Sequence, residues 1–271
     1  MRVASVASDP FHEIYYLNAS PGGRPETSRL PFVRVAVEGL PPDLGGLLVT
    51  SDLQGVAPIA ARGGAAGLLG EAVVEALVTL EEQGEVPALG GMGAIVAGDL
   101  FSEATARKRG ASGDVREVWQ ALARAFRWAA GVGGNHDHFG ETQGERAAFQ
   151  RQPGIHLLDG DVVELDGLRV GGVSGIIGNR EKPKQRDERA FLDLLDGVLD
   201  ETPHVLVLHE GPDGGQANLQ GNPAIRQALA KARDLLVVCG HVHWDAPPRR
   251  AGPRRTDPER RSIPSTPRRR R

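Results

Sequence analysis

Carboxylate, amide and imidazole side chains follow five separate apolar runs in this sequence. Asp52 ends the run LLVTSD, Asp99 ends GAIVAGD, and Asn135 follows GVGG. His209 and His241 come at the ends of HVLVLH and LLVVCGH in the same way. Short apolar runs of this kind predict buried strands, and ligand crevices in open α/β sheets form at strand ends. The sequence therefore predicts that these five residues meet at one site.

Each motif taken alone also has a structural explanation. A strand-end aspartate such as Asp99 is often a helix cap, and a histidine in an apolar strand, such as His209, is more often a core residue than a ligand. The segments GNHDH at 134–138 and GHVH at 240–243 are more specific, because two histidines separated by one residue in a glycine-led turn point the same way. The order SDLQG, AGDL, GNHDH, LHEGP, CGHVH carries more information than any one segment.

That order resembles the calcineurin-like metallophosphoesterases, whose pattern is D-x-H, GD, GNH(D/E), H and GHxH, over residues 48–243. The resemblance implies an α/β fold with two packed β-sheets flanked by helices. It also implies a two-metal site, bridged by Asp99, with the ligands Asp52, Gln54, Asp99, Asn135, His209, His241 and His243. In the same way it implies that His136 contacts the phosphate and protonates the leaving group. Asp137 is expected to orient His136.

Two divalent ions in such a site would clamp a phosphate and activate water as a hydroxide nucleophile. Mixed oxygen and nitrogen ligands suit borderline ions, so we expect Mn first, with Fe, Zn, Co or Ni as the other choices. Gln54 stands where the family has histidine, and its amide oxygen is a poorer ligand, so the first metal should bind more weakly. The expected reaction is hydrolysis of a phosphomonoester or a phosphodiester. AGDLFSEA replaces the GDxVDRG signature of protein serine/threonine phosphatases, which favours a small phosphoester or a nucleotide as substrate.

Two other functions remain open. One is a catalytically weakened metal-binding scaffold whose Arg-rich tail recruits nucleic acid or a protein, and the other is a nuclease of the same superfamily. The segment from Arg249 to Arg271 contains ten arginines and two acidic residues, so its charge is +8. Because the net charge of the chain is −3, residues 1–248 carry a charge of −11. An acidic body repels a polyanion at long range. Nucleic acid is therefore expected to bind only through the tail.

Apolar residues at helical spacing alternate along the chain with short apolar runs, which predicts an α/β layered fold. The expected helices cover residues 71–83, 115–130, 187–198 and 223–232. The expected strands cover FVRVAVEGL, LLVTSD, 93–99, 204–210 and 234–240, with a hairpin over 162–175 that turns at Asp166–Gly167.

The predicted domain organisation has three parts. Residues 1–30 lack a clean period and contain the turn formers SPGGRPETS, so we expect an irregular N-terminal extension. Residues 31–248 should form the metallophosphoesterase domain, and the Arg- and Pro-rich residues 249–271 a disordered tail.

The sequence also gives an expectation for location and for two residues near the last motif. The lone cysteine, Cys239, and the lack of an apolar leader or a spanning segment predict a cytoplasmic protein with no membrane contact. Cys239 itself is expected to be a core thiol. Trp244, beside GHVH, is expected to pack against the protein in preference to stacking on a base.

Overall fold

The computed structural model of the chain describes residues 1–60, 63–216 and 218–244. The tail expected at 249–271 lies outside these ranges. In the described part, no helix is both long enough and apolar enough to cross a bilayer.

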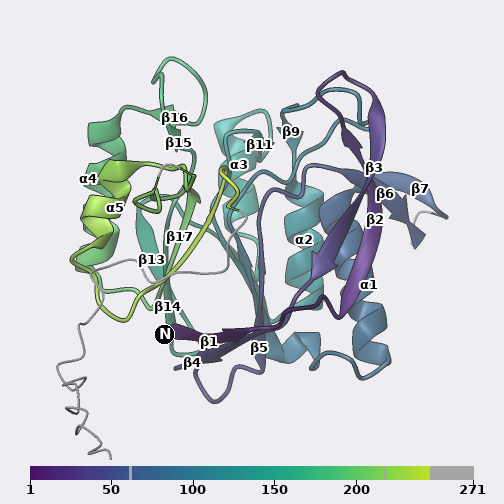
Figure 1. The fold of residues 1–271 in the computed structure, drawn as a ribbon, viewed down its shortest axis with the longest axis horizontal. Coiled ribbons are helices and arrows are strands. Elements are labelled where there is room, and N and C mark those ends of the chain that lie inside the picture. The colour runs from purple at the N-terminus through teal and green to yellow at the C-terminus, as the bar shows by residue number, and fades with distance from the viewer. Residues whose placement is uncertain (61–62, 217, 245–271) are drawn as a thin grey trace, which may run out of the picture.

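Two four-stranded sheets form the centre of the molecule (Figure 1). The first has the order β12-β10-β8-β5 and is parallel throughout, and its strands are β5 (Gly46–Thr50), β8 (Met92–Val96), β10 (Trp128–Gly131) and β12 (Ile155–Leu157). The second has the order β13-β14-β17-β18, and its strands are β13 (Asp161–Leu165), β14 (Leu168–Val173), β17 (Val205–Glu210) and β18 (Leu236–Gly240). Only β13 runs antiparallel to its neighbour in this sheet. The hairpin expected at Asp166–Gly167 is confirmed as β13 and β14.

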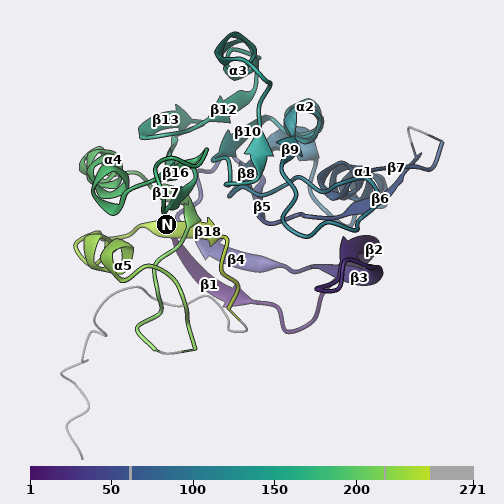
Figure 2. The ribbon, with the colours of Figure 1, turned by 90° about the horizontal axis from the view of Figure 1, so that it is seen from above.

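Helices cover the outer face of each sheet (Figures 1 and 2). The described helices are α1 (Leu69–Glu82), the 3-10 turn η2 (Leu89–Gly91), α2 (Arg116–Ala125), α3 (Gln143–Gln150), α4 (Glu188–Asp200) and α5 (Pro223–Leu229). Seen from above in Figure 2, α1 and α2 lie on the side of the first sheet and α4 and α5 on the side of the second. The predicted fold class, two packed sheets flanked by helices, is confirmed.

Alternation along the central strands explains these layers. In β8 and the residue after it, Ala94 and Val96 pack toward the helices, whereas Ile95 and Ala97 pack between the sheets. In β17, Leu206 and Leu208 pack in the cluster with α4 and α5, while Val205 and Val207 pack in the cluster between the sheets. Successive strand side chains point to opposite faces, so a strand that is apolar at every position must be covered on both sides.

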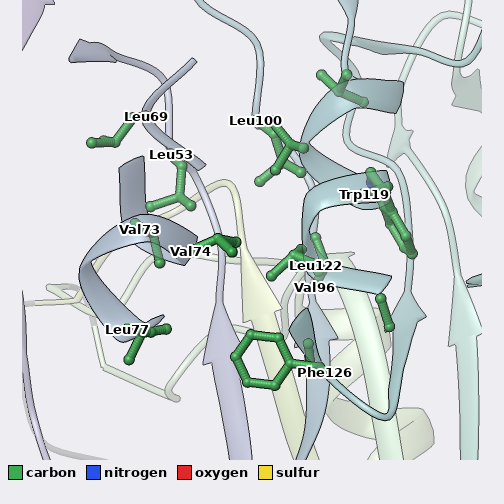
Figure 3. Close-up of a cluster of buried hydrophobic side chains, with 14 of the residues drawn as sticks. Leu53, Leu69, Val73, Val74, Leu77, Val96, Leu100, Trp119, Leu122 and Phe126 are labelled. Atoms are coloured by element: carbon green, nitrogen blue, oxygen red, sulfur yellow. The ribbon is translucent and has the colours of Figure 1, made fainter. Parts of the chain in front are cut away.

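Helix α1 shows how the outer layer is held. Leu69, Val73 and Leu77 recur at four-residue spacing and enter one buried cluster with Trp119 and Leu122 of α2 (Figure 3). Full burial of one such aliphatic side chain contributes roughly 1.5–3 kcal/mol. This cluster fixes α1 and α2 against the strands that carry the polar site.

The N-terminal region corrects one prediction, because residues 1–30 are not irregular. They contain the strands β1 (Arg2–Val6), β2 (His12–Ala19) and β3 (Pro25–Phe32), and the last two join β6 (Val56–Ile59) and β7 (Ala65–Leu68) in the sheet order β3-β2-β6-β7. The cluster of turn formers is the hairpin turn between β2 and β3, closed by a 2.9 Å bond from Ser20 N to Arg24 O. Prolines are tolerated in β3 because it is an edge strand.

Strand β1 pairs with β4 (Val35–Glu38) in a separate ribbon that reaches the second sheet. The Met1 amine donates to Asp234 O at 2.8 Å, and the Met1 side chain packs in the cluster that holds Leu236 and Val238 of β18. The N-terminal residues are therefore part of the packed body.

A second correction concerns the helix expected over 115–130. It ends at Ala125, and Trp128–Gly131 forms the central strand β10, which is buried at every position. Periodicity alone does not separate a short buried strand from the end of a helix. The remaining short strands are β9 (Gly113–Asp114), β11 (Asp137–His138), β15 (Ile176–Ile177) and β16 (Gln185–Arg186).

Candidate metal centre

The polar residues singled out in the sequence lie at the carboxyl ends of β5, β8, β10, β17 and β18. These strands are parallel within each sheet, so their ends meet at one edge. Asp52, Asp99 and His241 have φ of 54°, 56° and 64°. Positive φ costs about 1–3 kcal/mol at a residue that is not glycine, and such strain gathers at functional sites.

Glycines allow the strand ends to approach one another. A Cβ added at Gly134 would clash with the carboxylate and backbone of Asp99, and one at Gly240 would clash with Asp52. Gly98 has a φ of 88°, and a Cβ added there would clash with the backbone of Gly134. The glycine in front of each polar residue in GD, GN and GH is thus required by close packing of neighbouring loops.

Three of the expected ligands form a compact cluster. Asp99, His209 and His241 each offer one ligand atom, and these atoms lie within 4.8 Å of one another. Asp99 Oδ2 is 3.3 Å from His209 Nε2, and the two histidine rings are 5.2 Å apart between centroids. One carboxylate and two imidazoles at this separation match a site for a borderline divalent cation.

Each of the other four expected ligands lies next to a member of this cluster or next to another expected ligand. Gln54 Nε2 lies 3.3 Å from Asp99 Oδ2, and Asn135 Oδ1 lies 3.2 Å from His209 Nε2. Asp52 Oδ2 is 3.5 Å from His243 Nε2 and also accepts from the His241 backbone N–H at 3.1 Å. The fold therefore brings all seven residues to one edge.

Charge at the cluster favours a cation. Burial alone would lower the pKa of His209, but its hydrogen bond to Asp99 and the charges of Asp99 and Asp52 raise it to about 9. Burial is the largest single influence on Asp99 and pushes its pKa upward, but the hydrogen bonds and positive charges of His209 and His136 together outweigh it, so the Asp99 pKa is lowered. Without a metal, a proton on His209 balances the carboxylates, and a divalent ion would replace that proton. The residues of this cluster thus fit a divalent metal ion.

Asp137 has a different role from the one expected. Its side chain is fully buried, and its oxygens accept from the backbone N–H groups of Asp99, Leu100 and Gly134 at 2.8, 2.7 and 2.9 Å. Burial and the neighbouring charge of Asp99 raise its pKa. The prediction that Asp137 orients His136 is wrong, because both oxygens are used to clamp the loop after β8 to the loop after β10.

His136 is oriented by a residue that the sequence reasoning missed. Its Nδ1 lies 3.1 Å from Ser112 Oγ, and its backbone N–H donates to Asp99 Oδ1 at 2.9 Å. Its carbonyl oxygen accepts from Gly113 N at 3.1 Å. Ser112 belongs to no motif, and only the pairing of β9 with β11 places it beside the ring.

Two further residues were missed. Ser174 Oγ accepts from Gly133 N at 3.0 Å and donates to Leu158 O at 2.7 Å, which holds the loop before Asn135. Lys184 Nζ lies 4.9 Å from the centre of the Phe139 ring and has no hydrogen-bond partner in the described ranges. Burial lowers the pKa of Lys184 to about 8, against the opposing effect of the Asp137 charge.

Comparison with known protein families identifies this chain's family. A family model described as Calcineurin-like phosphoesterase matches residues 47–245, a range that contains all seven expected ligands and His136. No curated protein matches the chain closely enough to count as a relative.

Proposed function

The chain belongs to the calcineurin-like phosphoesterase family, whose chemistry is metal-dependent phosphoester hydrolysis, and on that premise we propose that it hydrolyses a small phosphomonoester or phosphodiester at a two-metal centre. The observation that carries the proposal is the cluster of Asp99, His209 and His241 at the shared edge of the two sheets. Its residue types are those that bind borderline divalent ions.

We assign the ligands to two ions, with Mn preferred at both. One ion takes Asp52, Gln54, Asp99 and His243, and the other takes Asp99, Asn135, His209 and His241. When bound, a pair of divalent ions polarises the phosphate and lowers the pKa of a water molecule. Asp99 is the natural residue to serve both ions, because its carboxylate adjoins Gln54 and His209.

His136 supplies the proton for the leaving group in this proposal. The hydrogen bond between Ser112 and Nδ1 fixes the ring, which leaves Nε2 to donate to the departing oxygen. The bond from the His136 backbone to Asp99 ties the position of the ring to that of the metal ligands. Asp137 preserves the distance between the two ligand loops.

Charge supports a small substrate in preference to nucleic acid. Residues 1–248 carry −11, which opposes the approach of a long polyanion. Binding of nucleic acid is proposed only for the tail at 249–271. Cys239 is the single cysteine of the chain, so no disulfide can form within it, and this supports a location in the reducing cytoplasm.

The test is hydrolysis of p-nitrophenyl phosphate and bis(p-nitrophenyl) phosphate by protein stripped of metal and then reloaded with Mn²⁺, Fe²⁺, Zn²⁺, Co²⁺ or Ni²⁺. Turnover should require metal and fall by about a hundredfold or more in Asp99→Asn. Asp193→Asn is the matched control, because that carboxylate is 71% exposed. Turnover without metal, or full activity in Asp99→Asn, would contradict the proposal. Tight metal binding with no turnover would favour the scaffold alternative.

A further inference from the structure

An open hollow of about 350 Å³ lies directly beside the candidate metal centre. Asp52 and His243, two of the proposed metal ligands, form part of its wall. Its other lining residues are Ser51, Gly211, Pro212, Gln220, Cys239, Gly240, Val242 and Trp244. A phosphate held at the centre would therefore have room on this side for the organic group that it carries.

Apart from the two ligands, the lining combines the side chains of Pro212, Cys239, Val242 and Trp244 with two polar residues, Ser51 and Gln220. None of the lining residues in the described part of the chain is a lysine or arginine. Cys239 is exposed, which corrects the expectation of a core thiol. A second anionic group in the hollow would therefore find no lysine or arginine to pair with, whereas an uncharged group needs no such partner, so the hollow favours an uncharged group.

Trp244 is fixed in place by the protein. Its indole Nε1 donates to Gln220 O at 2.6 Å, which joins the segment after β18 to the loop after β17. Trp244 was expected to pack against the protein. The hydrogen bond ties the indole N–H edge to the protein, but the side chain is only partly buried and lines the hollow. A tryptophan held at one edge is a rigid surface for a flat ring.

We propose that the hollow binds the organic group of the substrate and selects an uncharged aromatic group that packs on Trp244. This inference rests on the proposed function, since the metal centre must hold the phosphate. It narrows the substrate class to aryl or heteroaryl phosphoesters and disfavours esters with a second charged group. Three consecutive cations, Arg107, Lys108 and Arg109, do not line the hollow. They precede Gly110, where an added Cβ would lie 3.3 Å from His136 Cε1.

The test compares three phosphonates as ligands of the Mn²⁺-loaded protein by titration calorimetry, which needs no turnover. Phenylphosphonate carries an aromatic ring, methylphosphonate carries only a methyl group, and 3-phosphonopropionate carries a second acidic group, its carboxylate. Phenylphosphonate should bind about five to ten times more tightly than methylphosphonate, as expected for a ring that gains one aromatic contact. The 3-phosphonopropionate should bind no more tightly than methylphosphonate.

Variants test whether Trp244 and the hollow cause the preference for phenylphosphonate. Trp244→Phe keeps a ring and should retain most of the preference for phenylphosphonate, whereas Trp244→Ala should abolish it. Cys239→Phe fills the hollow and should also abolish it, which keeps the proposal testable if Trp244→Ala does not fold. Tyr15→Ala removes an aromatic ring that is 63% exposed outside the hollow and should leave all three affinities unchanged.

The outcomes separate the two proposals. Equal binding of phenylphosphonate and methylphosphonate to the unaltered protein, or a preference that survives both Trp244→Ala and Cys239→Phe, would overturn the hollow as the organic subsite while leaving the metal centre intact. Tighter binding of 3-phosphonopropionate would overturn the selection against charge. Failure of every phosphonate to bind the metal-loaded protein would overturn the proposed function as well.

Discussion

The charge state of His209 makes the stability of the metal-free protein fall as pH rises above 6.5. Its pKa is raised from 6.5 to about 9 in the folded state, so the folded protein holds the proton more tightly than the unfolded chain does. The stabilisation is fully present below pH 6.5 and is lost as pH rises through 9. A bound divalent metal ion reverses this pH dependence of stability, because the ion binds the neutral His209 ring.

The magnitude follows from linkage. Each pH unit between 6.5 and 9 removes about 1.4 kcal/mol, which gives about 2 kcal/mol between pH 6.5 and 8 and about 3 kcal/mol over the whole range. The pKa of Lys184 is lowered to about 8, and its effect has the opposite sign, but it begins only above pH 8. Histidines whose pKa is lowered by burial, such as His156, change stability only below pH 6.5.

The assay is urea unfolding of the metal-free protein at pH 6.5, 7.25 and 8, with His209→Gln alongside. The variant lacks the titrating ring but keeps Asp137, whose pKa is raised by burial, so the difference between the two slopes isolates His209. Wild-type stability should fall by about 2 kcal/mol more than that of the variant. Equal slopes, or a wild-type stability that rises with pH, would refute the reasoning. With Mn²⁺ present, the wild-type slope should change sign.

Three further perturbations test other parts of the site. Gln54→His replaces an amide with a better ligand and should tighten the weaker metal by about tenfold in a chelator competition; an unchanged affinity would show that Gln54 is not a ligand. Gly134→Ala places a methyl group against Asp99 and should lower both metal affinity and the unfolding temperature, whereas Gly197→Ala, in open space on α4, should stabilise by about 0.5–1 kcal/mol. Ser112→Ala should slow hydrolysis of an alkyl phosphoester about tenfold more than that of a p-nitrophenyl ester, since only the poorer leaving group needs the proton from His136; equal losses on both esters would mean that Ser112 does not serve proton transfer.

Much of the central fold follows from local patterns in the sequence. The central strands are apolar at nearly every position, which is what burial between a sheet and a helix layer requires. The polar residue after each run then marks the strand end, and parallel order brings those ends together. The convergence of Asp52, Asp99 and His209 was predictable because each depends only on its own strand and on the shared direction.

The predictions failed where tertiary context decides. Strand β3 contains two prolines, and both β2 and β3 carry many polar residues. The two strands pair with each other, and β2 also pairs with β6. Trp128–Gly131 continues the apolar pattern of α2, so only its place between β8 and β12 identifies it as a strand. The roles of Ser112 and Asp137 depend on which loops meet across the sheet edge, which no motif encodes.

Backbone conformation, as well as side-chain type, limits which residues this centre accepts. Asp52 and Asp99 both have positive φ, a region in which Asp and Asn are far better tolerated than alanine or any branched residue. Asp99→Ala would therefore add backbone strain to the loss of a ligand, and the two effects could not be separated. Asp99→Asn removes the charge at an unchanged φ. For that reason the asparagine variant measures what the carboxylate itself contributes to the centre.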